Sequence, residues 1–380
     1  MSTEQLAAEL DTLRLVDHHV HGALASTVDR AAFEELITES DRPIPPFMTQ
    51  LDSQVGFAIR RHCAPLLGLP AFAAPAGYFA RRAELGETEV NRILLGASGV
   101  GAYLLDTGYR GDAILDVPGM AAASGSSTHE IVRLESVLEA VAARRPGAGE
   151  LVAAFRDELA TATANAVGTK SIIAYRHGFA FDPERPGPAE VTKAAETWLA
   201  QIDRGGPVRV SSPVLLRFLL WEGVDRGLPL QLHVGYGDPD VDLDRCDPLL
   251  LTRWLKLVES SGTPIMLLHC YPFHRNAGYL AQVFPHVYFD VGLGINYTGA
   301  RSDAVIAESL ELAPFAKTLF SSDAWGPAEL HLLGARLWRR GMAKVLGAWV
   351  DEGEWSSADA IRVATMIGRE NAIRVYGLTS

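Results

Sequence analysis

Cysteine is scarce in this sequence of 380 residues, which contains only Cys63, Cys246 and Cys270. These cysteines are odd in number, lie far apart and form no CxxC pair. The sequence therefore indicates neither a disulfide framework nor a thiolate zinc site. We expect a protein of the reducing cytoplasm.

Basic charge and long apolar runs are also limited. The chain has 34 basic against 46 acidic side chains and a formal net charge of -12, so it lacks the clustered positive charge that attracts nucleic acids and anionic membranes. The longest apolar stretches, such as residues 66–80, fall short of the roughly 18 residues of a membrane span. The N-terminus places acidic residues before any basic one, the wrong order for a secretory signal. We expect a small-molecule substrate, no nucleic-acid or membrane partner, and a chain that could also form a homo-oligomer.

Short apolar runs alternate with longer segments of helical periodicity, a pattern typical of βαβ units and a parallel sheet. The predicted helices include residues 188–202, 213–226, 249–261, 276–284 and 304–312. The predicted strands are residues 13–20, 101–106, 130–134, 169–175, 229–234, 265–269, 287–291 and 318–322. Eight such units in one α/β chain predict a (β/α)8 TIM barrel.

Residues 22–100 separate the first predicted strand from the second, where a barrel needs only one loop and one helix. Parts of this stretch, residues 29–40 and 54–67, have helical periodicity. We predict a helical insertion over one mouth of the barrel, inside a single domain that spans residues 1–380. An amphipathic helix pair at residues 356–376 is expected to pack on the barrel exterior.

Two histidines mark the end of the first predicted strand. His19 and His21 are two residues apart in the segment LVDHHVHG, and the period of a strand places both side chains on one face. Two converging neutral imidazoles suit zinc, manganese, iron or nickel. By spacing alone, a solvated turn whose polar side chains bond to backbone is the more common arrangement.

Three further polar residues change that balance. His233, His269 and Asp323 each end an apolar run, after the fifth, sixth and eighth predicted strands. Active sites of TIM barrels are assembled at the carboxyl ends of the strands. Four separate strands that finish in metal-competent side chains predict a metal site better than coincidence does.

The pattern of HxH after strand one, His after strands five and six, and Asp after strand eight resembles the amidohydrolase superfamily of metal-dependent hydrolases. Longer stretches are similar to its FluG-type branch, whose members often carry such a barrel fused to a glutamine-synthetase-like domain. These stretches are GTKSIIAYRHGF (168–179), LQLHVGYGDPDVDL (230–243), LLHCYPFHRNAGYLAQVFPHVYFDVG (267–292), LFSSDAWG (319–326) and RENAIRVYGL (369–378).

The resemblance implies a catalytic divalent metal held by His19, His21, His233 and Asp323, with zinc first and manganese as the alternative. Asp323 would accept the proton of an attacking water and pass it to the leaving amine. His269 would stabilise the developing oxyanion or act as a further ligand. The implied reaction is hydrolysis of an amide or related C–N bond, and the fusion habit of the branch suggests an N-substituted amide such as a γ-glutamyl conjugate.

Lys170 decides the number of metal ions. In two-metal members of the superfamily a carboxylated lysine on strand four bridges the ions, whereas a plain ammonium cannot be a ligand. The alternative for Lys170 is a place low in the strand, paired to a carboxylate. Arg176 has a fixed fork suited to a substrate carboxylate, although an ordinary salt bridge would also account for it.

Two further substrate contacts are predicted near the strand tips. Asp240 lies in an acidic run directly after His233 and could meet a cationic substrate group. The run lacks the glycine and glutamate of an EF-hand loop, so a solvated loop is the simpler interpretation. His274 follows the sixth strand closely and is a second candidate for substrate contact.

Two other functions are compatible with the sequence. A non-oxidative decarboxylase of the same superfamily would use one metal and the same ligands. A non-catalytic barrel would serve as a regulatory or scaffold module, but a scaffold has no chemical need for the ligand residues.

Overall fold

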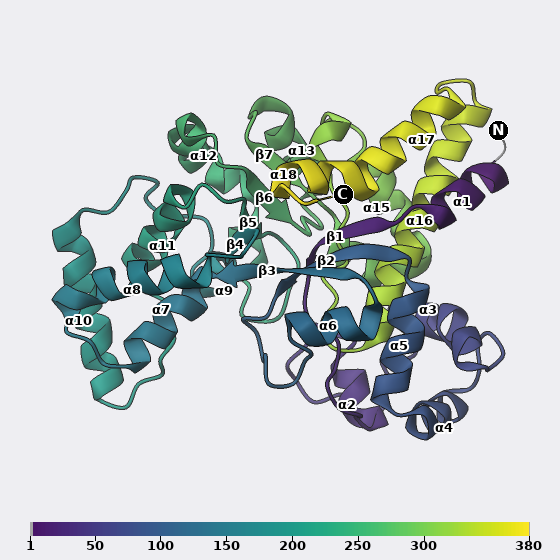
Figure 1. The fold of residues 1–380 in the computed structure, drawn as a ribbon, viewed down its shortest axis with the longest axis horizontal. Helices are drawn as coiled ribbons and strands as arrows, with labels where there is room; N and C mark the ends of the chain where they lie inside the picture. Colours follow the sequence, from purple (N-terminus) through teal and green to yellow (C-terminus); the bar gives the residue numbers. More distant parts are fainter. Residues whose placement is uncertain (1–2, 380) are drawn as a thin grey trace.

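The computed structural model describes residues 3–379, and a parallel sheet whose strands follow one another in chain order forms its centre (Figure 1). All neighbouring strands in this sheet pair in the parallel sense. The strands are β1 (Leu15–Val20), β2 (Val100–Asp106), β3 (Ser127–Arg133), β4 (Gly168–Ser171), β5 (Leu230–His233), β6 (Ile265–Leu268) and β7 (Val287–Phe289).

The predicted eighth strand, residues 318–322, is extended chain rather than a regular strand. Its backbone nevertheless pairs on both sides. The Leu319 amide donates to the Phe289 carbonyl of β7 at 3.0 Å, and the His18 amide of β1 donates to the Phe320 carbonyl at 3.1 Å. The segment thus joins the last strand to the first, and the predicted TIM-barrel fold is confirmed.

Helices surround the sheet. The α-helices are α1 (Thr3–Thr12), α2 (Arg30–Glu35), α3 (Gln54–His62), α4 (Pro75–Leu85), α5 (Glu87–Ala97), α6 (Val117–Ser124), α7 (Leu134–Ala143), α8 (Ala148–Ala162), α9 (Ile173–Arg176), α10 (Pro188–Asp203), α11 (Pro213–Asp225), α12 (Thr252–Val258), α13 (His274–Val283), α14 (Gly292–Thr298), α15 (Ser302–Ser309), α16 (Ala328–Asp351), α17 (Ser357–Thr365) and α18 (Asn371–Tyr376). Short 3-10 segments occupy Ala64–Leu67, Leu243–Cys246, Pro248–Leu251, Glu259–Ser261, Gly299–Arg301 and Phe315–Lys317, and a π-helical turn occupies Met366–Glu370. Within the described residues, no helix combines the length and apolar character needed to cross a bilayer.

The long connection between β1 and β2 contains α2 to α5, which gather at the lower right of Figure 1. Apolar side chains of this connection, such as Phe33, Ile59 and Leu94, belong to the same buried cluster as Leu333 and Leu337 of α16. Of these helices, α3 and α5 pack directly against α16. The assignment of the whole chain to one domain stays a prediction.

The barrel interior is apolar at the amino-terminal ends of the strands. Val16, Ala102 and Met266, each in the first half of its strand, pack there in one buried cluster that also includes Tyr376 of α18. The predicted helix pair at residues 356–376 is present as α17 and α18, joined by the π-helical turn. This arrangement leaves the opposite, carboxyl ends of the strands for polar side chains.

The fourth strand is shorter than predicted. It was expected over residues 169–175 but ends at Ser171, and α9 begins at Ile173. The physical reason is a buried carboxylate on α7: Glu135 Oε1 accepts hydrogen bonds from the Ser171 hydroxyl at 2.6 Å and from the Ile172 amide at 3.0 Å. These bonds replace the next bonds of the strand ladder and turn the chain.

Candidate metal centre

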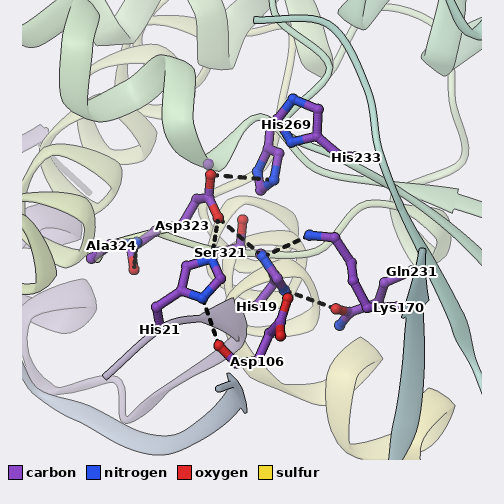
Figure 2. Close-up of polar contacts among 12 residues, drawn as sticks. His19, His21, Asp106, Lys170, Gln231, His233, His269, Ser321, Asp323 and Ala324 are labelled. Carbon is purple, nitrogen blue, oxygen red and sulfur yellow. Dashed lines mark hydrogen bonds and ion pairs between the residues drawn. The ribbon is translucent and has the colours of Figure 1, made fainter. Parts of the chain in front are cut away.

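Residues from distant parts of the chain converge at the carboxyl ends of the barrel strands (Figure 2). His19 Nε2 lies 3.0 Å from Asp323 Oδ1, and His21 Nε2 lies 3.6 Å from the same oxygen. The ligand atoms of these three residues all fall within 4.8 Å of one another. On the other side of the carboxylate, His269 Nε2 lies 3.3 Å from Asp323 Oδ2, and the His233 ring is 4.9 Å from the His269 ring.

Hydrogen bonds define which nitrogen of each first-strand histidine carries the proton. Gln231 donates from its amide nitrogen to the His18 carbonyl at 2.8 Å, so its oxygen must accept from His19 Nδ1 at 2.8 Å. His21 Nδ1 donates to the Asp106 carbonyl at 2.6 Å. Both imidazoles therefore carry their proton on Nδ1 and direct the lone pair of Nε2 at Asp323, as metal-binding histidines do.

A cation fits this centre, because without one its acceptors oppose each other. Burial lowers the pKa of His19 well below its usual range and that of His21 to about 4, so both rings stay neutral. The His19 lone pair then faces a carboxylate oxygen at 3.0 Å, two acceptors with no proton between them. A divalent ion ligated by both groups removes that repulsion.

His233 and His269 also have ring nitrogens that form no hydrogen bond to a described residue. Within residues 3–379, no hydrogen-bond partner is recorded for His233 Nε2 or for either ring nitrogen of His269, although all three atoms are buried. Buried polar atoms without partners are uncommon in native proteins and call for a ligand or an ion. The donor set of imidazoles and one carboxylate suits zinc or manganese.

The backbone of two of these residues lies in the left-handed region. His269 has φ 68° and Asp323 has φ 50°, values that non-glycine residues adopt at a cost of about 1–3 kcal/mol each. Asp290, which follows β7, holds both segments: its Oδ1 accepts from the His269 amide at 3.0 Å and from the Ser321 hydroxyl at 2.6 Å. Its Oδ2 lies 3.0 Å from His18 Nε2. One buried carboxylate thus ties together three strand ends of the site.

Lys170, at the end of β4, belongs to the centre. Its Nζ is 3.0 Å from His19 Nε2 (Figure 2). Among the described residues, no carboxylate lies within salt-bridge distance of this nitrogen. The predicted alternative of a carboxylate pair is therefore wrong. Burial lowers the pKa of Lys170 to about 8, so near neutral pH the ammonium predominates but the neutral amine is far more accessible than in an ordinary lysine.

The centre opens into a cavity of about 680 Å³. Arg176 and Asp240 line this cavity as the predicted substrate contacts require, but each already has a partner. Arg176 Nη1 lies 3.0 Å from Glu139 Oε1, and Asp240 Oδ2 lies 2.8 Å from Arg209 Nη2. The ordinary salt-bridge interpretation of Arg176 is thus the one that the geometry supports.

His274 does not reach the cavity, so its predicted substrate contact needs correction. It is the first residue of α13, and its Nε2 lies 2.6 Å from Glu308 Oε2 on α15. The side chain is turned between two outer helices rather than toward the strand ends. Closeness in sequence to a strand tip does not decide the direction of the first side chain of a helix.

Sequence reasoning missed the groups that position or surround the ligands. Arg133 and Asp290 lie at strand ends, which was the available signal, whereas Gln231 lies inside β5. The partners of all three come from distant segments. Glu39, between α2 and α3, lines the cavity. Burial and the nearby charges of Asp323 and Asp238 raise the pKa of Glu39 to about 7, against a hydrogen bond from Tyr297 that lowers it.

The barrel and its histidine-carboxylate centre define the class of a metal-dependent TIM-barrel enzyme. The profile of the family described as Amidohydrolase matches residues 115–378, and the chain belongs to this family. Protein fluG of Emericella nidulans is 31% identical over 225 residues, which are 56% of this chain and 26% of the relative. The chain thus spans about a quarter of that curated relative. The resemblance stated from the sequence is confirmed.

Solved structures extend the similarity over the whole chain. A Lactobacillus casei protein assigned as a metal-dependent hydrolase is 29% identical with a TM-score of 0.87, covering 98% of this chain and 97% of the other. A uronate isomerase of Bacillus halodurans is 14% identical with a TM-score of 0.64, covering 100% of this chain and 96% of the isomerase. The uronate isomerase of Thermotoga maritima is 13% identical with a TM-score of 0.61, covering 98% and 97%. At these low identities the isomerases show the fold alone.

Proposed function

We propose that the protein hydrolyses an amide or related C–N bond of a small molecule by attack of water at a divalent metal site. The supporting observation is the convergence of neutral imidazole nitrogens on Asp323 at the carboxyl ends of the strands, in a member of the amidohydrolase family. When bound, the divalent ion supplies polarisation of the substrate carbonyl and a lowered pKa of water. Zinc is our first candidate and manganese the second.

Asp323 moves the proton in this proposal. Its Oδ1 faces His19 and His21, the two candidate ligands of β1. Its Oδ2 points away from them, toward His269. Oδ2 accepts the proton of the attacking water and then returns it to the nitrogen of the leaving amine as the C–N bond breaks. His269 makes no side-chain hydrogen bond to the described residues, although its Nε2 lies 3.3 Å from Asp323 Oδ2. We propose that its N–H donates to the substrate oxygen, where negative charge develops.

Lys170 sets the number of ions. A neutral lysine amine reacts with CO2 to form a carbamate and release a proton, and the lowered pKa of Lys170 makes this neutral amine more accessible than in an ordinary lysine. The carbamate oxygens would be anionic ligands beside His19. We propose that this form accompanies a second ion held by His233 and His269, and that an uncarboxylated Lys170 accompanies a single ion.

The test is turnover by metal-depleted protein reconstituted with zinc or with manganese. The substrates are N-acyl amino acids, γ-glutamyl amides and carboxylated arenes. We expect metal-dependent release of amine from an amide and no CO2 from the arenes. Release of CO2 instead would assign the protein to the decarboxylases. Failure to bind either metal, with no shift of Tm on its addition, would indicate a non-catalytic barrel.

A further inference from the structure

A second functional group lies beside the metal centre at the end of β3. Arg133 is the register partner of Lys170 on the neighbouring strand, and paired strands lie about 4.8 Å apart. The Arg133 side chain is only 8% exposed, yet it lines the cavity. A buried guanidinium therefore faces the same space as the candidate ligands.

Asp106 holds this guanidinium in one orientation. Arg133 donates to Asp106 Oδ2 from Nε at 3.0 Å and from Nη2 at 2.6 Å. The other carboxylate oxygen, Oδ1, accepts from the Gly108 amide at 2.9 Å. A Cβ at Gly108 would lie 2.9 Å from the Arg133 Cβ, so the absence of a side chain there lets the backbone pack against the arginine stem. The side chain is fixed before any ligand arrives.

The third nitrogen of this guanidinium, Nη1, does not bond to Asp106. Within residues 3–379 no hydrogen bond or ion pair is recorded for Arg133 Nη1, and this atom is not among the fully buried ones. Since both other nitrogens bond to Asp106, Nη1 is the donor that a molecule in the cavity can reach. An arginine held by a carboxylate on one side and free on the other is suited to bind an anionic oxygen.

The other arginines of the cavity wall are less suited. The guanidinium of Arg176 is engaged by Glu139 and by the Val210 carbonyl. Arg209 is 41% exposed and pairs with Asp240, so solvent screens its charge. Arg176 Nε has no hydrogen-bond partner among the described residues, but this atom is fully buried, so a molecule in the cavity cannot reach it. Arg42 is 76% exposed and pairs with Asp41, and the Arg110 guanidinium lies over the Trp325 ring.

The charge balance at this end of the cavity also favours an anion. An imidazole that ligates an ion is neutral, so the positive charges of Arg133 and Lys170 then cancel the negative charges of Asp106 and Asp323. A divalent ion then adds two positive charges. Carboxylation of Lys170 with a second ion gives the same net charge, so the conclusion does not depend on the metal count.

We propose that Arg133 binds a carboxylate of the substrate through Nη1. This proposal rests on the proposed function in one respect, namely that the anionic molecule is the amide to be cleaved. It narrows the substrate class to small amides that carry an acidic group close to the scissile bond. Arg133, and not Arg176, is then the residue that selects for that group.

Binding of glutarate and of its monoamide, glutaramate, to the metal-loaded full chain tests this. Both molecules have one carboxylate for the metal, so the ratio of their Kd values reports the second acidic group. We expect the wild type to prefer glutarate by about 10–100-fold, as one hydrogen bond between charged groups provides. In Arg133→Lys this preference falls about 10-fold, because one ammonium cannot serve both Asp106 and the ligand. Inorganic phosphate is tested in parallel, and an Arg133-dependent affinity for phosphate above that for glutarate would overturn the assignment to a carboxylate.

Two more variants control the result. The double variant Arg133→Gln with Asp106→Asn removes both buried charges together and should abolish the preference. Arg209→Gln removes the same charge from the rim of the cavity and should leave it unchanged. Metal content is measured for each protein. If the double variant does not fold, Arg133→Lys alone decides, and an unchanged preference in that variant overturns the proposal, as does an equal loss in Arg209→Gln.

The outcome is separable from the proposed hydrolysis because binding is measured without turnover. An Arg133-dependent preference in a protein that cleaves no amide would leave the anion site standing and remove the hydrolase. Amide turnover that depends neither on an acidic group of the substrate nor on Arg133 would leave the hydrolase standing and remove the anion site.

Discussion

Replacement of Gln231 by leucine separates metal binding from stability at the centre. Gln231 Oε1 accepts from His19 Nδ1 at 2.8 Å, and its amide nitrogen donates to the His18 carbonyl and to the Tyr376 hydroxyl, both at 2.8 Å. Leucine has a similar volume but no polar atoms. Gln231→Leu therefore removes the bond that keeps the His19 proton on Nδ1.

Two effects of different size follow. Loss of an outer partner of a metal-binding histidine lowers metal affinity by about 10–100-fold, or about 1.4–2.7 kcal/mol at 25 °C. The buried His18 carbonyl also loses its side-chain donor, and an unsatisfied buried polar group costs about 1–3 kcal/mol of the free energy of unfolding.

The matched control is Tyr376→Phe. This change removes a hydroxyl that contacts Gln231 and His18 but not His19. We expect a similar loss of stability, about 1–3 kcal/mol, with metal affinity unchanged.

The assay is titration of the metal-free variants with zinc against a competing chelator, combined with urea unfolding of the same metal-free proteins. Wild-type affinity in Gln231→Leu would contradict the assignment of His19 Nε2 as a ligand atom. An equal loss of zinc affinity in both variants would show that the affinity follows the stability of the barrel and not the hydrogen bond to His19.

Three further changes have defined outcomes. Asp323→Asn should keep the fold, as circular dichroism would show, but lose turnover, whereas the exposed Asp359→Asn should keep turnover; an active Asp323→Asn would remove that residue from proton transfer. Lys170→Ala should reduce the metal content from two equivalents to one by elemental analysis, and a wild type with a single equivalent would exclude a carboxylated bridge. Burial raises the pKa of Glu39 from 4.5 to about 7, so the folded state disfavours its ionised form and stability falls as pH rises between these values. Glu39→Gln should therefore stabilise the metal-free protein by about 3 kcal/mol at pH 8 but by less than about 1 kcal/mol at pH 5, measured by urea unfolding; an equal gain at both pH values would contradict the raised pKa.

The order of the strands could be predicted because buried parallel strands read as short apolar runs. The long helix α16 was not predicted, and its glycines explain why. A Cβ at Gly334 would lie 2.4 Å from the Ser322 Cβ, and one at Gly341 would lie 2.3 Å from Ile306 Cδ1. These glycines permit close packing on several sides of α16, which weakens the amphipathic pattern that marks a surface helix.

The candidate ligands were visible in the sequence because each is a polar residue at the tip of an apolar run. The groups that orient them were not, since their roles depend on partners far away in the chain. Asp290 acts on His269, Ser321 and His18, and no local pattern records such contacts. Arg176 shows the converse. A guanidinium is suited to a substrate carboxylate, but the Arg176 guanidinium already forms an ion pair with Glu139.

The most direct test of the account is an anomalous-scattering crystal structure of the zinc-loaded protein, recorded on both sides of the zinc edge. We predict an anomalous peak about 2.0–2.2 Å from His19 Nε2, His21 Nε2 and an oxygen of Asp323, the usual distances for zinc with nitrogen and oxygen ligands. A peak ligated by other residues, or none at the strand ends in crystals that contain zinc, would contradict the account.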